Sequence, residues 1–152
     1  MPRRLEVFVL VLALFGGCQP SPALACQYDP QIIREAARQG VEPWVAVAIV
    51  HAESSGNPGA VGPGGERGLF QLTKPVWRVR FPGQVKADWG FNPQMNIEAG
   101  VWNLARSGAR NAKETVSWHN AGRKDYRNLN PKWVRDHPNR IYRSIYRGEM
   151  TQ

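Results

Sequence analysis

Apolar residues recur along the chain at spacings typical of short helices. The first such pattern covers residues 29–40, where we expect Asp29 as the N-cap, Pro30 in the first turn and Gly40 as the stop signal. A 3.6-residue period predicts that its apolar residues share one face, and these are Ile32, Ile33, Ala36 and Ala37.

Further helices are predicted downstream. The second covers about 43–54 and is apolar enough to be a core helix, with a predicted stripe of Trp44, Val47, Ala48, His51 and Ala52. Asn92-Pro93 begins a central helix that continues towards Gly108 through Ile97, Val101, Leu104 and Ala105. Shorter helices are expected over about 112–119 and 138–146.

The segments between these helices carry turn signals. Glycine and proline are dense over 56–68, which predicts a shaped loop, and 74–85 is where a short hairpin is acceptable. The predicted fold class is mainly α: one domain of several short helices, with a glycine-rich loop and at most a small β-hairpin.

The first 25 residues have the three parts of a secretory signal peptide: Arg3 and Arg4, an apolar run over 7–15, and a small-residue end at 23–25. The run is shorter than the roughly 20 residues that a membrane-spanning helix needs. We therefore expect export to the periplasm or cell envelope and a mature domain over 26–152. Processing at Cys18 as a lipoprotein is the alternative, and the fate of Cys26 stays open.

Charge narrows the choice of partner. The formal net charge is +8, and removing residues 1–25 takes away two arginines and Glu6, which leaves +7. Such a chain favours anionic partners. Because export argues against nucleic acid, bacterial wall polymers with their peptide carboxylates fit better.

Three clusters carry candidate chemistry. Glu53 ends an apolar helix beside the glycine-rich loop, where partial burial and the helix dipole would raise the pKa of a carboxylate and suit it to be a general acid. Gln71 lies inside an apolar run, either bonded to the backbone or orienting a sugar's N-acetyl group. Residues 117–122 place aromatic, imidazole and amide groups at a helix end before a glycine. Each cluster taken alone also fits a purely structural role.

Together, in this order, the clusters resemble the soluble lytic transglycosylase domain of the lysozyme-like superfamily. Residues 49–72 resemble that family's Glu-Ser motif, Asn-Pro turn and Gly-Leu-Met-Gln motif, with Phe70 in place of Met. Residues 119–122 resemble its Tyr-Asn-Ala-Gly motif, and Tyr142 matches a tyrosine near the C-terminus.

The resemblance implies an enzyme that needs no cofactor and cleaves the bond between N-acetylmuramic acid and N-acetylglucosamine. Glu53 would protonate the glycosidic oxygen and then deprotonate the muramoyl 6-hydroxyl, which closes a 1,6-anhydro ring. Expected substrate contacts are Ser54, Gln71, Trp118, His119, Asn120 and Tyr142. His119 replaces the family tyrosine, and when protonated it would change the pH dependence of Glu53.

Competing interpretations remain. A lysozyme would use the same acid to transfer the sugar to water, and an inactive module would only bind peptidoglycan. A catalytic metal is not expected, because only His51, His119 and His137 are available and no metal-binding spacing occurs. We expect a monomer that serves general wall turnover or opens the wall locally for a secretion or conjugation apparatus.

Overall fold

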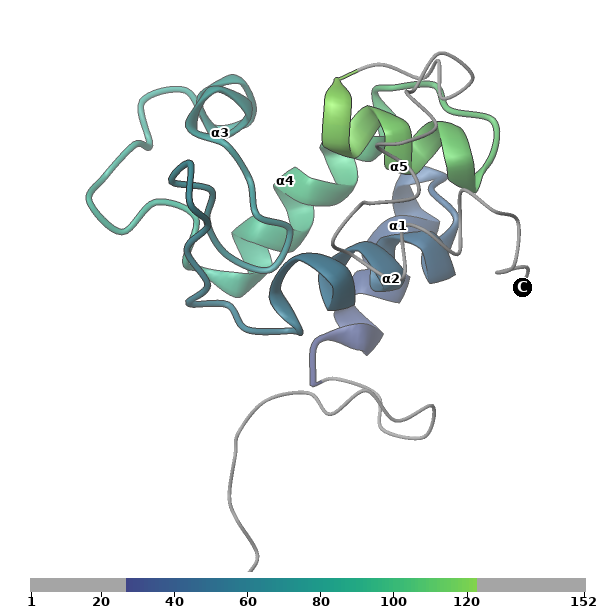
Figure 1. Cartoon of the computed structure of the whole chain (residues 1–152), viewed down its shortest axis with the longest axis horizontal. Helices are drawn as coiled ribbons and strands as arrows, with labels where there is room; N and C mark the ends of the chain where they lie inside the picture. Colours follow the sequence, from purple (N-terminus) through teal and green to yellow (C-terminus); the bar gives the residue numbers. More distant parts are fainter. Residues whose placement is uncertain (1–26, 123–152) are drawn as a thin grey trace, which may run out of the picture.

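The structure, a computed structural model, describes residues 27–122. Within this range it contains five α-helices: α1 (Asp29–Gln39), α2 (Pro43–Ser54), α3 (Lys74–Arg80), α4 (Pro93–Ala105) and α5 (Ala112–Ala121). Figure 1 shows α4 crossing the middle of the fold, with α3 and its loops on one side and α1, α2 and α5 on the other. Helix α4 contacts α1, α3 and α5, so it connects the two sides. The predicted mainly α fold is confirmed.

Short polar residues and prolines set the helix starts. Asn92 caps α4 by accepting a 3.0 Å hydrogen bond from the Met95 amide, and Asn111 caps α5 by accepting one from Glu114. The prediction of Asp29 as the N-cap of α1 is wrong. Tyr28 occupies that position, and the Asp29 carboxylate lies 3.1 Å from Nε2 of His51 on α2. Asp29 therefore joins two helices instead of capping one.

The buried face of α1 is narrower than predicted. Ile32 and Ala36 are fully buried, whereas Ile33 and Ala37 are exposed, Ile33 by 45%. Only one stripe of α1 meets α2 and α4. The apolar residues beside that stripe therefore face outwards.

Helix α2 has the predicted bounds and is a core helix, but its most buried face was predicted wrongly. Its fully buried residues include Val45, Ala46, Ile49 and Val50, while Trp44, Val47 and Ala52 are only partly buried. His51 keeps 30% of its side chain exposed. Because almost every position of α2 is apolar, periodicity could not distinguish the face towards the core.

Residues 74–80 form α3, so the short hairpin that the sequence would have allowed over 74–85 does not form. Pro75 lies in the first turn of α3, and Trp77 anchors the helix in the core by donating a 2.9 Å hydrogen bond from Nε1 to the Gln84 carbonyl. The β-bridges in the described range lie earlier instead, between Val61 and Arg67 and between Arg67 and Leu72. These bridges hold together the two sides of the predicted glycine-rich loop over 56–68.

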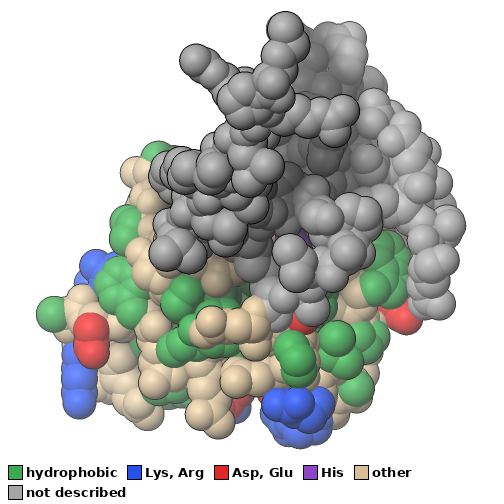
Figure 2. All heavy atoms as spheres, turned by 90° about the horizontal axis from the view of Figure 1, so that it is seen from below, with side chains coloured by type: hydrophobic (Ala, Val, Ile, Leu, Met, Phe, Trp, Pro, Cys, Tyr) green, Lys and Arg blue, Asp and Glu red, His purple; other side chains and the backbone are tan. Residues whose placement is uncertain are grey.

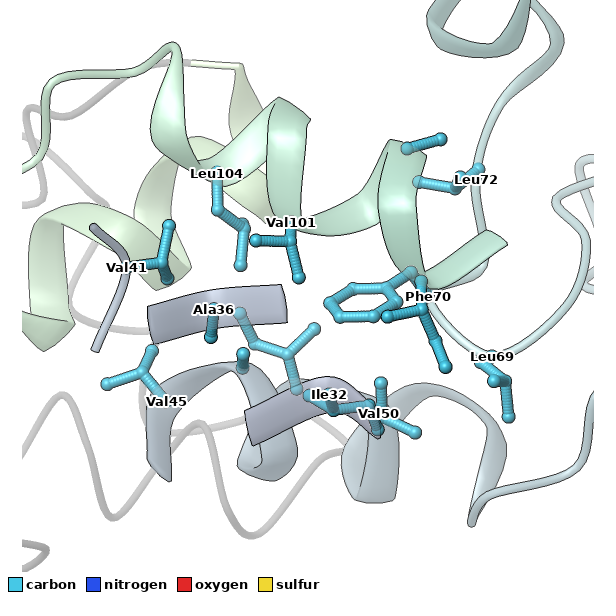
Figure 3. Close-up of a cluster of buried hydrophobic side chains, with 14 of the residues drawn as sticks. Ile32, Ala36, Val41, Val45, Val50, Leu69, Phe70, Leu72, Val101 and Leu104 are labelled. Carbon is cyan, nitrogen blue, oxygen red and sulfur yellow. The ribbon is translucent and has the colours of Figure 1, made fainter. Parts of the chain in front are cut away.

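The core joins the loop to the helices (Figure 3). Phe70 is fully buried beside α4, where Gly100 leaves room for its ring; a Cβ at Gly100 would lie 2.3 Å from that ring. Asn96 is also fully buried, accepting from the Phe70 amide and donating to the carbonyls of Arg67 and Gly90. None of the described helices is long and apolar enough to cross a bilayer.

Candidate active site

Glu53 lies in the last turn of α2, where the chain leaves the core. The two residues after the helix, Ser55 and Gly56, are both in the left-handed region with φ of 52° and 75°, and this turn directs the chain into the glycine-rich loop. The Glu53 side chain is 22% exposed. The side chain is thus largely enclosed but still has some contact with solvent.

His119 approaches Glu53 from α5. Its Nε2 lies 3.3 Å from Oε1 of Glu53, and its side chain is only 7% exposed. The other ring nitrogen, Nδ1, is buried and has no hydrogen-bond partner among the described residues. The C-terminal turns of α2 and α5 therefore bring together the acid and the imidazole that were predicted from the sequence.

Ser54 holds the loop against the helix. Its hydroxyl donates to the Leu69 carbonyl at 2.8 Å and also lies 3.1 Å from the Val50 carbonyl. A hydroxyl has one proton, so these contacts already use its donor capacity. The predicted contact of Ser54 with substrate stays a prediction, and the observed contact ties α2 to the segment that carries Gln71.

Gln71 adopts a left-handed backbone conformation, φ 46°, which is uncommon for a residue with a side chain. Its Nε2 donates to the carbonyls of Ala60 and Gly68, at 3.1 and 2.9 Å. Its Oε1 lies beside Gly62, where a Cβ would come within 2.7 Å. The amide nitrogen is therefore bonded to the backbone, and the oxygen is the atom of this side chain that can still accept from a ligand.

A hollow of about 340 Å³ lies beside His119. It brings together four residues predicted from the sequence: Gln71, Trp118, His119 and Asn120. Trp118 is fixed in its wall by a 2.8 Å hydrogen bond from Nε1 to the Asn103 carbonyl. The arrangement offers aromatic and amide groups next to the Glu53–His119 contact, which suits a sugar.

Sequence reasoning missed part of this hollow. Asn103 on α4 and Arg106, which caps the end of that helix, line it, as do Thr73 and Val76. Asn103 and Arg106 are three residues apart at the end of a helix otherwise rich in apolar residues, and this spacing puts both on one face. That polar pair was the available signal.

Two other acids, Glu66 in the glycine-rich loop and Glu98 on α4, have contacts of their own. Glu66 accepts a 2.9 Å hydrogen bond from the Gly64 amide within the loop, and Glu98 pairs with Arg80. Asp88 is exposed. Among residues 27–122, no three His, Cys, Asp or Glu side chains are grouped so that they could hold a metal ion. Tyr142, the 138–146 helix, the signal peptide and Cys26 lie outside the described residues.

Comparison with known proteins identifies the family. Residues 30–131, about two thirds of the chain, match the model of the transglycosylase SLT domain. The chain therefore belongs to the transglycosylase SLT domain family. This confirms the resemblance drawn from the ordered motifs.

Known proteins are similar to parts of this chain in sequence and in fold. Membrane-bound lytic murein transglycosylase C of Yersinia pestis and of Yersinia pseudotuberculosis is 38% identical over 87 residues, covering 53% of this chain and 24% of the relative. An inactive mutant of the lytic transglycosylase Slt from Pseudomonas aeruginosa superposes with a TM-score of 0.53 at 23% identity, over 63% of this chain and 17% of that one. The chain thus spans about a quarter or less of these relatives, and the structural likeness shows the fold.

Proposed function

We propose that this protein is a peptidoglycan lytic transglycosylase in which Glu53 is the single acid and base. The observation that carries the proposal is the 3.3 Å contact between Glu53 and His119, placed beside a hollow lined by Gln71, Trp118 and Asn120. The names of the Yersinia relatives and of Slt support the reaction class. In that Slt structure the inactive mutant has a glutamine in place of a glutamate.

In the proposed reaction Glu53 acts first as a general acid and then as a general base. Glu53 in its acid form donates a proton to the glycosidic oxygen as the bond to C1 of N-acetylmuramic acid breaks. The resulting carboxylate then takes the proton of the muramoyl 6-hydroxyl as that oxygen bonds to C1. The proton returns to Glu53, and the product is a 1,6-anhydro end.

His119 and Gln71 are assigned as positioning and binding residues. The nearly buried imidazole holds the Glu53 carboxylate from one side. The Oε1 of Gln71 is suited to accept from an acetamido N–H, because its amide nitrogen is already bonded to the loop. Export through residues 1–25 would bring the enzyme to the wall, in general turnover or for a secretion or conjugation apparatus.

Mass spectrometry of the soluble products tests the proposal. Purified peptidoglycan would be incubated with the wild type and, separately, with Glu53→Gln, which keeps the size of the side chain but whose amide cannot act as an acid or a base. We expect anhydromuropeptides from the wild type alone. Reducing muramic acid ends would mean a lysozyme instead, and binding to peptidoglycan without any product would mean a binding module.

A further inference from the structure

Arg106 is a charged side chain held in place at the wall of the hollow. It is the C-cap residue of α4, and its Nε donates a 3.1 Å hydrogen bond to Oδ1 of Asn103. Its guanidinium carbon lies 4.8 Å from the ring centre of Trp102 and 5.6 Å from that of Trp118. Both distances are in the range of a cation–π contact, so the guanidinium lies against two aromatic rings although the side chain is exposed.

No described carboxylate forms an ion pair with this arginine. Three other arginines on the same fold do have carboxylate partners: Arg38 pairs with Glu35, Arg80 with Glu98 and Arg110 with Glu114. The hydrogen bond from Arg38 even lowers the pKa of Glu35. Among residues 27–122 Arg106 contacts neutral groups and pairs with no carboxylate; Arg34, Arg67 and Arg78 have none either, but they do not line the hollow.

The charges around the hollow suit a ligand that carries one negative group. Among its described lining residues Arg106 is the one permanently charged side chain; the others are amides, a hydroxyl, an imidazole and apolar groups. A guanidinium recognises a carboxylate by paired hydrogen bonds. A neutral sugar needs no such partner.

We propose that Arg106 is a carboxylate-binding residue of the hollow and makes the enzyme select glycan strands that carry carboxylates over neutral ones. The inference rests on the proposed function and deepens it. Two sources supply this chemistry on wall glycan: the carboxylates of the stem peptide, and the lactyl carboxylate of muramic acid once the peptide has been removed. Arg106 would then bind a carboxylate of the substrate while the other side chains of the hollow bind its sugar.

The test compares variants on strands of defined chemistry. The substrates are peptide-bearing strands, strands stripped of peptide by an amidase, and each of these with its carboxylates converted to amides. The variants are Arg106→Gln, Arg106→Lys and the control Arg34→Gln, which removes the same charge from an exposed position of α1 outside the hollow. Thermal unfolding establishes that each variant is folded.

We expect Arg106→Gln to raise KM about tenfold on carboxylate-bearing strands, with kcat nearly unchanged, and to match the wild type on amidated strands. The KM of Arg106→Lys should lie between those of the wild type and Arg106→Gln, since lysine keeps the charge but lacks the paired N–H groups of the guanidinium. The KM of Arg34→Gln should equal that of the wild type. An effect on peptide-bearing strands alone assigns the peptide carboxylates, and one on stripped strands alone assigns the lactyl group. An equal KM for amidated and unmodified strands in the wild type would overturn the inference without any variant.

Binding measurements separate this inference from the proposed function. Calorimetry with Glu53→Gln, alone and combined with Arg106→Gln, gives the Kd for each strand without turnover. A tenfold loss of affinity on adding Arg106→Gln, for carboxylate-bearing strands only, supports the role of Arg106 even if the wild type yields no cleavage product. Equal Kd values for the two proteins would refute it even if the wild type is an active transglycosylase.

Discussion

At the active site, His119 lies where the family's Tyr-Asn-Ala-Gly motif has a tyrosine. This replacement changes the groups that can influence the protonation of Glu53. Both side chains can donate one hydrogen bond to a carboxylate. An imidazole can also become a cation in the pH range where enzymes work, whereas a phenol stays neutral there. At 3.3 Å, a cationic ring would favour the ionised form of Glu53 over the acid form that donates the proton.

We therefore expect His119→Tyr to keep at least about a tenth of the wild-type kcat/KM, since one hydrogen bond is retained. The alkaline limb of its pH–activity profile should move to higher pH, because Glu53 keeps its proton longer without a neighbouring cation. His119→Phe, which has no donor, should lose about tenfold or more. Identical profiles for the wild type and His119→Tyr would show that His119 carries no charge during the reaction.

Which residues could be predicted depended on whether their chemistry is visible in local sequence. Glu53, Gln71 and His119 stand out as polar residues next to apolar runs, and the structure places Gln71 and His119 on one hollow, with Glu53 against His119. Arg106 gives a weaker signal, its spacing of three residues from Asn103. An arginine at a helix end is common, and its contacts with Trp102 and Trp118 depend on how α4 meets α5.

Between elements, Asn96 connects three segments from inside the core. Asn96→Ala would leave the Phe70 amide and the carbonyls of Arg67 and Gly90 without their partner in a buried place. We expect a loss of about 3 kcal/mol in the free energy of unfolding. The control is Asn92→Ala, which removes only the exposed cap of the same helix and should cost about 1 kcal/mol. Chemical denaturation measures both, and equal losses would contradict the role given to Asn96.

Helix α4 also depends on a glycine in its interior. Gly100→Ala should destabilise the protein by about 1–3 kcal/mol despite the better helix propensity of alanine, because the new methyl group would meet the buried Phe70 ring. Gly59→Ala is the control, since its Cβ would lie 3.4 Å from the nearest atom, Oδ1 of Asn57, which is ordinary van der Waals contact. Thermal melts compare the two. A stabilised Gly100→Ala protein would mean that Phe70 moves aside at little cost.

Helix positions were more predictable than helix faces. Prolines and asparagines mark the starts of α2 and α4 in the sequence itself, because capping is local chemistry. The buried face of α2 and the helical state of 74–80 depend on neighbours far along the chain. Trp77 makes the difference for α3, since its packing against Phe81 and Trp89 stabilises a helix in a segment whose local pattern tolerated a hairpin.

Over the whole molecule, a net charge of +8 should govern how the protein meets an anionic wall. In the face drawn in Figure 2, Lys and Arg side chains stand near the edge of the described part, with hydrophobic side chains between them. Charges spread in this way act at long range through solvent. Salt screens them, with a Debye length of about 10 Å at 0.1 M and about 3 Å at 1 M.

Binding of Glu53→Gln to peptidoglycan sacculi should therefore weaken several-fold as salt rises from about 0.1 to 1 M, whereas binding to a neutral chitooligosaccharide should change little. Arg106→Gln, added to Glu53→Gln, should lower the affinity for sacculi at every salt concentration but leave most of the salt dependence, because it removes one charge of many and that charge acts by direct contact. Co-sedimentation with sacculi over a salt series measures both effects. If the double variant lost the salt dependence altogether, the attraction would come from Arg106 and not from the charge of the whole molecule.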